Sequence, residues 1–298
     1  MAKRLSHSAR ICGATHPSEM GAQPENSAID ILLRTITPIA DSISKKKTTN
    51  QKPTRPAILT HDIEGAFYQV HPSTLQEIMQ QRQMPMYLTK WVAAFNTARK
   101  MAFGFDQQSQ QPQPYRCGLS QGSPISPILF LIYSNAMLEK QHYPDDVIDT
   151  SYVDDICMVQ LSHTIPKANT RLEEQTEQHL ENGTLLGPTF ATPKTELLYC
   201  LPLTSKDKNK SLSSHPPLRV LGTTILAGRQ IKYLGVFIDE SLIFKYHATM
   251  AAARANNVLG ELEILMTLVT QHPRPHCPPL GNDSDLSCHV LGLSSMVG

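Results

Sequence analysis

The spacing of apolar and polar positions predicts a chain of helices and short strands. Apolar residues at helical spacing predict helices over residues 27–40, 73–82, 88–100, 171–181 and 248–268. The apolar segment 123–140 has a Pro-rich start and predicts a further helix after Pro127. Ser73 and Gln76 have the spacing of a capping box at the start of the second of these helices. Runs rich in β-branched residues predict strands at 57–60, 194–200 and 231–238. The order shows no regular βαβ alternation, which favours an α+β fold with a small, mostly antiparallel sheet packed on helices.

The polar stretches between these elements predict loops. Residues 1–26 are polar and irregular, and residues 106–115 form a Gln/Pro-rich segment that suits a loop or a ribbon tip. Residues 204–217 resemble a polar linker. From residue 270 the chain is rich in Pro, Gly and Ser, which is typical of an unstructured tail.

Composition narrows the classes of function. The chain has 298 residues, 40% hydrophobic and 18% charged, with a formal net charge of +1, so net charge gives no argument for a nucleic-acid partner. The basic pairs and triplets at 3–4, 45–47, 99–100 and 206–210 are typical of solvated loops. The start of the chain lacks the apolar core of a secretory signal, and the longest apolar run, 125–133, is too short for a membrane span. Together with six scattered cysteines and no C-x-x-C pair, these features favour an intracellular protein of the nucleus or cytoplasm, neither secreted nor membrane-bound.

Two adjacent aspartates, Asp154 and Asp155, interrupt the apolar segment 150–161. Alone, the pair predicts two strands joined by a tight turn, because aspartate side chains satisfy backbone groups in turns. A functional interpretation requires a further carboxylate from another strand, and Asp62 at the end of the 57–60 strand meets that requirement. Carboxylates at strand ends can hold Mg²⁺, which is usually completed by water and substrate phosphates. A bound cation would also offset the repulsion between the two like charges.

Three segments give the chain a specific resemblance. They are H-D-I-E-G-A-F-Y-Q-V at 61–70, C-G-L-S-Q-G-S-P-I-S-P-I-L-F-L-I-Y-S-N at 117–135 and S-Y-V-D-D-I-C-M-V at 151–159. In this order they resemble the palm of a reverse transcriptase, in particular that of non-LTR (LINE-type) retrotransposons of the fungal kind. Segments 20–33, 191–200, 231–239 and 251–262 resemble further motifs of the same family, so the resemblance covers about residues 19–268.

The resemblance implies RNA-directed DNA polymerase activity, in which two Mg²⁺ ions (or Mn²⁺) promote transfer of dNTPs to a DNA primer on an RNA template. Asp62, Asp154 and Asp155 match the family's catalytic metal ligands. Four residues match its nucleotide-binding positions: Phe67 as a steric gate against a ribose 2′-hydroxyl, Gln121 and Gly122 in the pocket lining, and Lys194 near the incoming phosphates. Four more match positions near the primer and template: Tyr152 beside the primer end, and Tyr233, Leu234 and Gly235 in the primer grip.

The resemblance also implies a domain plan. We expect a disordered N-terminus at 1–18, partial fingers at 19–56, the palm at 57–240, the start of a thumb helix at 241–269 and a disordered tail at 270–298. The family's basic fingers strands would precede residue 19 and its thumb would continue past residue 268, so we expect a chain truncated at both ends. Tyr68 and Ser120 stand where the family usually has aspartate and proline, and both departures concern packing rather than metal binding.

Other functions stay open at this point. A truncated retroelement remnant could retain the motifs without catalysis and bind nucleic acid only weakly. A viral-type RNA-directed RNA polymerase shares the palm carboxylates, but Phe67 and the Q-G-S-P-I-S-P segment at 121–127 argue against it. A group II intron or retron enzyme would require fingers or maturase regions that we do not find. The sequence leaves the oligomeric state undetermined.

Overall fold

The computed structural model describes residues 1–45, 54–97, 99–102, 104–105, 108–109, 111–114, 118–138, 147–187, 189–190, 194–200, 216–220 and 222–271. The chain divides into one unit at Met1–His247 and another at Ala248–Gly298. The basic run at 206–210, nearly all of the expected linker and the tail from residue 272 lie outside the described residues.

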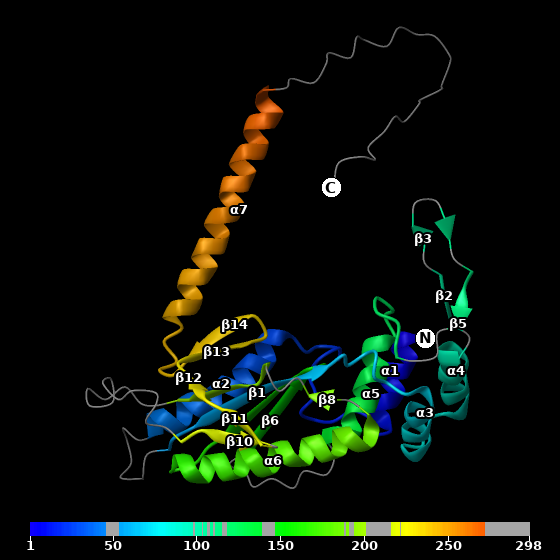
Figure 1. Ribbon diagram of the computed structural model, residues 1–298, viewed down its shortest axis with the longest axis horizontal. Helices are drawn as coiled ribbons and strands as arrows, with labels where there is room; N and C mark the ends of the chain where they lie inside the picture. Colours follow the sequence, from blue (N-terminus) through cyan, green and yellow to red (C-terminus); the bar gives the residue numbers. More distant parts are fainter. Residues whose placement is uncertain are drawn as a thin grey trace. The chain divides into compact units, whose positions relative to one another are not determined.

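The first unit is built around a mixed sheet in which β1 (Ala57–Glu64) is central (Figure 1). The strand order is β12 (Ala227–Gly228), β9 (Glu196–Tyr199), β1, β7 (Asp155–Gln160), β6 (Val147–Tyr152), and β8 (Thr189–Phe190) pairs with the far end of β1. Every pairing is antiparallel except that of β12 with β9. The prediction of a small, mostly antiparallel sheet is therefore confirmed.

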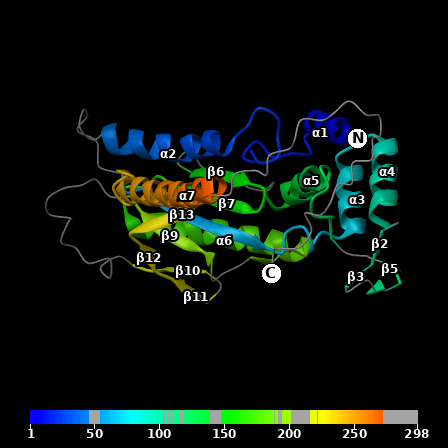
Figure 2. The same cartoon turned by 90° about the horizontal axis from the view of Figure 1, so that it is seen from above.

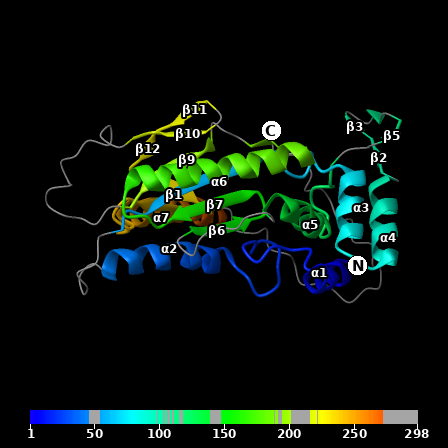
Figure 3. The ribbon, with the colours of Figure 1, turned by 90° about the horizontal axis from the view of Figure 1, so that it is seen from below.

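Alternation along β1 divides its side chains between two buried cores. Leu59 and Ile63 belong to the core beneath α6 (Ile165–Leu186), which runs across one face of the sheet (Figure 3). Ile58 belongs to the core on the opposite face, which also takes residues from α2 (Ala28–Lys45) and from the hairpin of β13 (Gln230–Tyr233) and β14 (Val236–Asp239). The sheet is thus covered on both faces.

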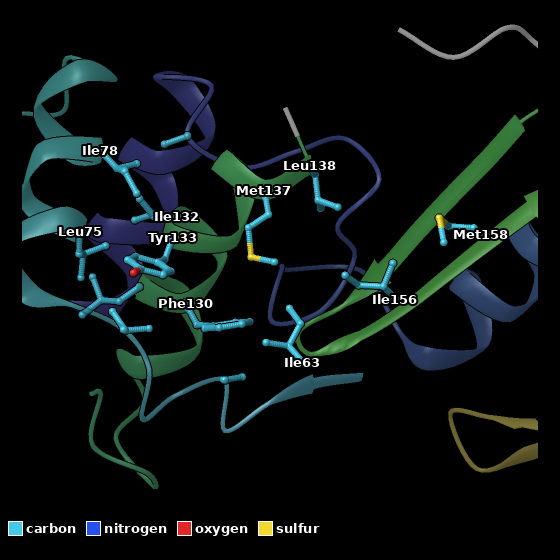
Figure 4. Close-up of a cluster of buried hydrophobic side chains, with 14 of the residues drawn as sticks. Ile63, Leu75, Ile78, Phe130, Ile132, Tyr133, Met137, Leu138, Ile156 and Met158 are labelled. Carbon is cyan, nitrogen blue, oxygen red and sulfur yellow. The ribbon is translucent and has the colours of Figure 1, made fainter. Parts of the chain in front are cut away.

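A group of helices extends the core beyond one end of the sheet (Figure 2). It comprises α1 (Ala2–Ile11), α3 (Pro72–Gln81), α4 (Met86–Thr97) and α5 (Ser126–Leu138). Phe130 and Tyr133 of α5 are fully buried, and Figure 4 shows them among apolar side chains that continue to Ile63 and Ile156 of the sheet. This shared core fixes the segments after β1 and before α5 relative to the strands.

Short ribbons complete the first unit. β2 (Lys100–Met101) pairs with β5 (Gln113–Pro114), β3 (Gly104–Phe105) with β4 (Gln108–Ser109), and β10 (Leu218–Val220) with β11 (Thr223–Ile225). The described strand residues of the Gln/Pro-rich segment, 108–109 and 113–114, lie in these two ribbons, in agreement with the expected loop or ribbon tip.

Four local expectations are corrected. Residues 2–11 form α1 instead of irregular chain, because Leu5 and Ala9, one turn apart, are buried against the core. α3 begins at Pro72 with His71 as N-cap and no side-chain cap, so the Ser73 capping box does not form. The expected strand at 231–238 is a hairpin of two strands. The helix expected at 171–181 extends over 165–186 and ends at Gly187, whose φ of 104° only glycine adopts readily.

Most of α7 (Lys245–Gln271) belongs to the second unit, and nearly all of the side chains described there are exposed. Among the described residues, no helix combines the length and apolar character needed to cross a membrane.

Candidate active site

Asp62 and Asp155 lie directly opposite each other on neighbouring strands. The β1–β7 register pairs Asp62 with Asp155, and the β6–β7 register pairs Asp155 with Tyr152. Side chains at directly paired positions project from the same face of an antiparallel sheet. Two predicted metal ligands and a predicted primer contact therefore share one face at one end of the sheet, the face that the β13–β14 hairpin also covers.

The turn between β6 and β7 places the third carboxylate. It consists of Val153 and Asp154, one residue earlier than the sequence suggested, because Tyr152 and Asp155 form the closing pair. The backbone N–H of Ile63 donates to the Asp154 carbonyl over 3.1 Å, which ties the turn to the end of β1. Val153 has a φ of 63°, a conformation that is a true outlier for a β-branched residue.

Burial and the neighbouring charges raise the pKa of two of these carboxyl groups. Burial, with the neighbouring charges of Asp154 and Asp62, raises the pKa of Asp155 to about 6. Burial also raises the pKa of Asp154, and the Lys194 ammonium opposes that shift. Nζ of Lys194 lies 2.6 Å from Oδ2 of Asp62, and this hydrogen bond raises the pKa of the lysine. Lys194 thus brings positive charge to the site, as the like-charge pair requires.

A cavity of about 410 Å³ opens beside this edge of the sheet. Its lining carries carboxylates, amines and a phenol, contributed by Asp62, Asp155, Lys194, Glu196, Lys232 and Tyr233. Glu196 is fixed there by accepting a hydrogen bond from the Lys232 backbone N–H over 2.9 Å. The predicted metal ligands Asp62 and Asp155 therefore share one cavity with the predicted phosphate contact Lys194 and with Tyr233 of the predicted primer grip.

The donor set suits a hard divalent cation, because carboxylate oxygens are the ligands that Mg²⁺ prefers. A cation beside Asp155 would stabilise its ionised form, which burial and the neighbouring carboxylates disfavour. In the described part of the chain, no three His, Cys, Asp or Glu side chains are already close enough together to hold a metal ion. The Lys194 ammonium instead donates a hydrogen bond to the Asp62 carboxylate. It thus occupies a position at which a metal cation would bind to that carboxylate.

Tyr233, Leu234 and Gly235 form the tip of the β13–β14 hairpin. Tyr233 pairs with Val236, so Leu234 and Gly235 are the two turn residues, with φ values of 47° and 82°. Positive φ at both positions suits the two-residue turns that join twisted strands, in which glycine is favoured. Tyr233 is buried, which raises its pKa well above the usual range, and it anchors the tip on the sheet.

Phe67 lies in the turn after β1, outside the cavity lining. Its ring is half-buried and packs against Phe130, with ring centroids 5.3 Å apart. Gln121 and Gly122 lie in the exposed turn before α5, also outside that lining. The structure therefore brings Asp62, Asp155, Lys194 and Tyr233 together in the cavity lining. The predicted gate residue Phe67 and the pocket residues Gln121 and Gly122 lie in two other segments, which the contacts of Tyr68 and Gly118 join to each other.

Those contacts come from residues to which sequence reasoning gave no role. The Tyr68 hydroxyl donates to Oε1 of Gln121 over 3.0 Å, so the departure from the family's aspartate links the two segments. A Cβ on Gly118 would lie 2.7–2.9 Å from the backbone of Phe67 and Tyr68, so only glycine permits this close approach. Arg99, which the sequence placed in a solvated patch, donates to the Ser120 hydroxyl over 3.0 Å and to the Gly118 carbonyl.

A mostly antiparallel sheet backed by helices, with acidic residues at the turn of its β6–β7 hairpin, is typical of the palm of nucleic-acid polymerases. Solved structures share this fold: apo telomerase from Candida tropicalis gives a TM-score of 0.55 at 11% identity, over 81% of this chain and 38% of that one. The same telomerase truncated from its C-terminal domain gives 0.53 at 11% identity, over 82% and 43%. The sequence pattern of the family described as reverse transcriptase (RNA-dependent DNA polymerase) matches residues 1–238. The chain belongs to the reverse transcriptase family.

Two mobile-element proteins are related in sequence. The RNA-directed DNA polymerase from mobile element jockey of Drosophila melanogaster is 27% identical over 198 residues, and that of Drosophila funebris is 25% identical over 193 residues. Each alignment covers 63% of this chain, which spans about a fifth of the length of these relatives. These relatives confirm the resemblance to non-LTR retrotransposon reverse transcriptases that the motifs indicated.

Proposed function

We propose that this chain is the polymerase part of a retrotransposon reverse transcriptase, which extends a DNA primer with dNTPs on an RNA template. The observation that carries the proposal is the pairing of Asp62 with Asp155 across β1 and β7, beside the turn that holds Asp154. Because the chain belongs to the reverse transcriptase family, we interpret these carboxylates as ligands for the metal ions of nucleotide transfer.

Asp62, Asp154 and Asp155 are the residues that would hold two Mg²⁺ ions, or Mn²⁺. When bound, such ions activate the primer 3′-hydroxyl and stabilise the leaving pyrophosphate. The protein contributes the geometry: Asp62 and Asp155 are fixed by the β1–β7 ladder, and Asp154 by the hydrogen bond from Ile63 to its carbonyl. The half-buried setting strengthens the attraction of these carboxylates for a cation.

Lys194 acts on the phosphate side of the cavity. Its ammonium is exposed and sits on a long side chain beside Asp62, so it can turn from the carboxylate to an incoming triphosphate. There it would offset negative charge and donate a proton to the departing pyrophosphate, as a general acid does. Lys232 lines the same cavity and adds a second positive charge.

Phe67, Gln121 and Gly122 would define the nucleotide pocket. The hydrogen bond from Tyr68 to Gln121 and the close approach of Gly118 hold their two segments together. The half-buried ring of Phe67 is kept in place by Phe130, so it presents a rigid edge that a ribose 2′-hydroxyl would meet. Such exclusion discriminates by penalising the wrong substrate.

The primer end would rest between β6 and the β13–β14 hairpin. Tyr152 lies beside Asp155 in the ladder, and Tyr233 enters the cavity from the hairpin. The tip residues Leu234 and Gly235 are held by two buried residues of the hairpin, Ile231 and Tyr233, so the hairpin is a fixed support for a strand of nucleic acid.

Primer extension tests the proposal. The purified chain is incubated with a labelled DNA primer on an RNA template, the four dNTPs and Mg²⁺, and with the same primer on a DNA template. Stepwise, template-directed extension on RNA that stops on chelation of the metal supports the proposed function. Retention of primer–template in a binding assay without extension would instead support an inactive remnant that binds nucleic acid.

A further inference from the structure

Glu19 is a buried acid in the loop between α1 and α2. Its side chain is 2% exposed and its carboxylate accepts three hydrogen bonds. Oε1 accepts from the backbone N–H of Gly21 over 2.6 Å and from that of Val153 over 3.1 Å, and Oε2 accepts from the Ser151 hydroxyl over 2.8 Å. Two of these three donors belong to the β6–β7 hairpin.

The loop backbone reinforces the same contact. The N–H of Ser151 donates to the Ser18 carbonyl over 3.0 Å, and the N–H of Met20 donates to the Ser151 carbonyl over 2.9 Å. Glu19 and Ser151 form a parallel bridge, so residues 18–20 run as a short extra strand along β6. This contact lies immediately before the turn that carries Asp154.

The turn requires such support. Val153 is the first of two turn residues, where a positive φ favours glycine, yet it is β-branched and has a φ of 63°. Backbone in such a conformation persists only where the surroundings hold it. The Glu19 carboxylate binds the N–H of Val153 itself, and Gly21 leaves room for it, since a Cβ there would lie 2.7 Å from both N and Cγ2 of Val153.

We infer that Glu19 is a positioning residue: it holds the strained Val153 turn so that Asp154 and Asp155 point to the metal site. This role rests on the proposed polymerase function, because the turn would affect activity by positioning the carboxylates of Asp154 and Asp155. Glu19 touches neither substrate nor metal ligand side chain in the described contacts, so it acts through the hairpin backbone.

Three variants separate positioning from folding. In Glu19→Ala the donors of Gly21, Val153 and Ser151 lose their acceptor. In Glu19→Gln the amide oxygen can still accept from Gly21 and Val153, while its NH₂ donates to the Ser151 oxygen, which accepts as well as it donates. In Glu19→Ala combined with Val153→Gly the turn no longer needs the support, because glycine adopts the positive φ at little cost. Glu25→Gln is the matched control, since Glu25 is an exposed acid in the same loop.

Two readouts are made on each full-length variant that retains its thermal unfolding transition. The first is hydrogen exchange at the Val153 amide, which does not depend on activity. The second is kcat and KM for primer extension. We expect Glu19→Ala to speed the exchange and lower kcat, each by at least about tenfold, with KM within about twofold. Glu19→Gln and Glu25→Gln should match the wild type, and Val153→Gly should restore kcat in the Glu19→Ala background.

The two proposals fail in different ways. If the wild type does not extend a primer, the polymerase function fails for this chain, while the exchange readout still decides whether Glu19 holds the turn. Unchanged Val153 exchange in Glu19→Ala would overturn the positioning role. A loss of kcat in Glu19→Ala that Val153→Gly does not restore would also overturn it. That result would mean that the substitution disturbs the fold in some way other than through the Val153 turn.

Discussion

The Nζ atom of Lys194 lies 2.6 Å from Oδ2 of Asp62, so a predicted phosphate contact forms an ion pair with a predicted metal ligand. Both groups line the same cavity, and Asp155 lies across the ladder from Asp62. The ammonium thereby supplies part of the positive charge that the acidic edge needs. Binding of a divalent cation at Asp62 would release it toward the triphosphate.

Replacement of Lys194 by methionine should separate these two roles. We expect Mn²⁺ to bind several-fold more tightly, because it no longer competes with the ammonium for Oδ2 of Asp62. Primer extension should slow by about a hundredfold, the usual effect of losing a general acid. Electron paramagnetic resonance of Mn²⁺ and single-turnover extension measure the two effects. Lys90→Met, at an exposed position of α4, is the matched control, and weaker Mn²⁺ binding in Lys194→Met would contradict the competition.

The Gly235 turn should be sensitive to a single methyl group. Gly235 has a φ of 82°, and nothing lies within 4 Å of a Cβ added there. An alanine would therefore meet no clash, but its backbone would be in the left-handed region, which costs an L-residue about 1–2 kcal/mol. Gly235→Ala should therefore lower the free energy of unfolding by about that amount. Gly260→Ala, inside α7, should instead favour its helix by roughly 1 kcal/mol. Chemical denaturation measures the first effect, and an unchanged midpoint in Gly235→Ala would contradict the turn assignment.

Phe67→Val should distinguish a gate from a core residue. If the ring excludes a 2′-hydroxyl, the smaller side chain should raise incorporation of ribonucleotides relative to deoxynucleotides by about a hundredfold or more. Loss of the Phe130 contact should also lower stability by roughly 1–2 kcal/mol, since the ring is only half-buried. Competition between rNTP and dNTP gives the ratio. Reduced stability with an unchanged ratio would leave Phe67 a packing residue.

Glu19 should make stability depend on pH. Burial, assisted by the charge of Asp154, raises its pKa from 4.5 to about 7, and the hydrogen bonds from Ser151, Val153 and Gly21 oppose this shift. Between about pH 4.5 and 7 the unfolded chain loses this proton while the folded chain keeps it, so the contribution to stability falls as pH rises. The unfolding free energy of the wild type minus that of Glu19→Gln should drop by on the order of 3 kcal/mol from pH 5 to pH 8. A Glu19→Gln difference that stays flat over this pH range would contradict the raised pKa.

Much of the fold could be predicted because its strands and helices have clear periodicity. The segment 150–161 predicted the hairpin, and the position of Asp62 at the end of the 57–60 strand suggested that it lies near the aspartate pair, although the register that pairs it with Asp155 was not predicted. The turn was predicted one residue late, because D-D is the usual turn signal and Val153 at a positive φ is not. α1 was missed because only Leu5 and Ala9 anchor an otherwise polar helix.

The support of the site was harder to predict. Glu19 lies in a polar loop, and its partner Ser151 is 132 positions away, so nothing local marks it as buried. Arg99 and Tyr68 likewise gain their roles only when the segment at Gly118 packs on the turn after β1. Periodicity reports which residues are apolar, whereas these three polar residues are fixed by tertiary contacts.

The central claim is that Asp62, Asp154 and Asp155 form the catalytic centre of an RNA-directed DNA polymerase. Its most direct test is the rate of primer extension on an RNA template with dNTPs and Mg²⁺, for the unmodified chain, Asp154→Asn and the control Asp41→Asn on the exposed surface of α2. We predict extension by the unmodified chain and by Asp41→Asn, and a loss of at least about a hundredfold in Asp154→Asn. Extension that survives in Asp154→Asn would contradict the site, and no extension by the unmodified chain would contradict the function.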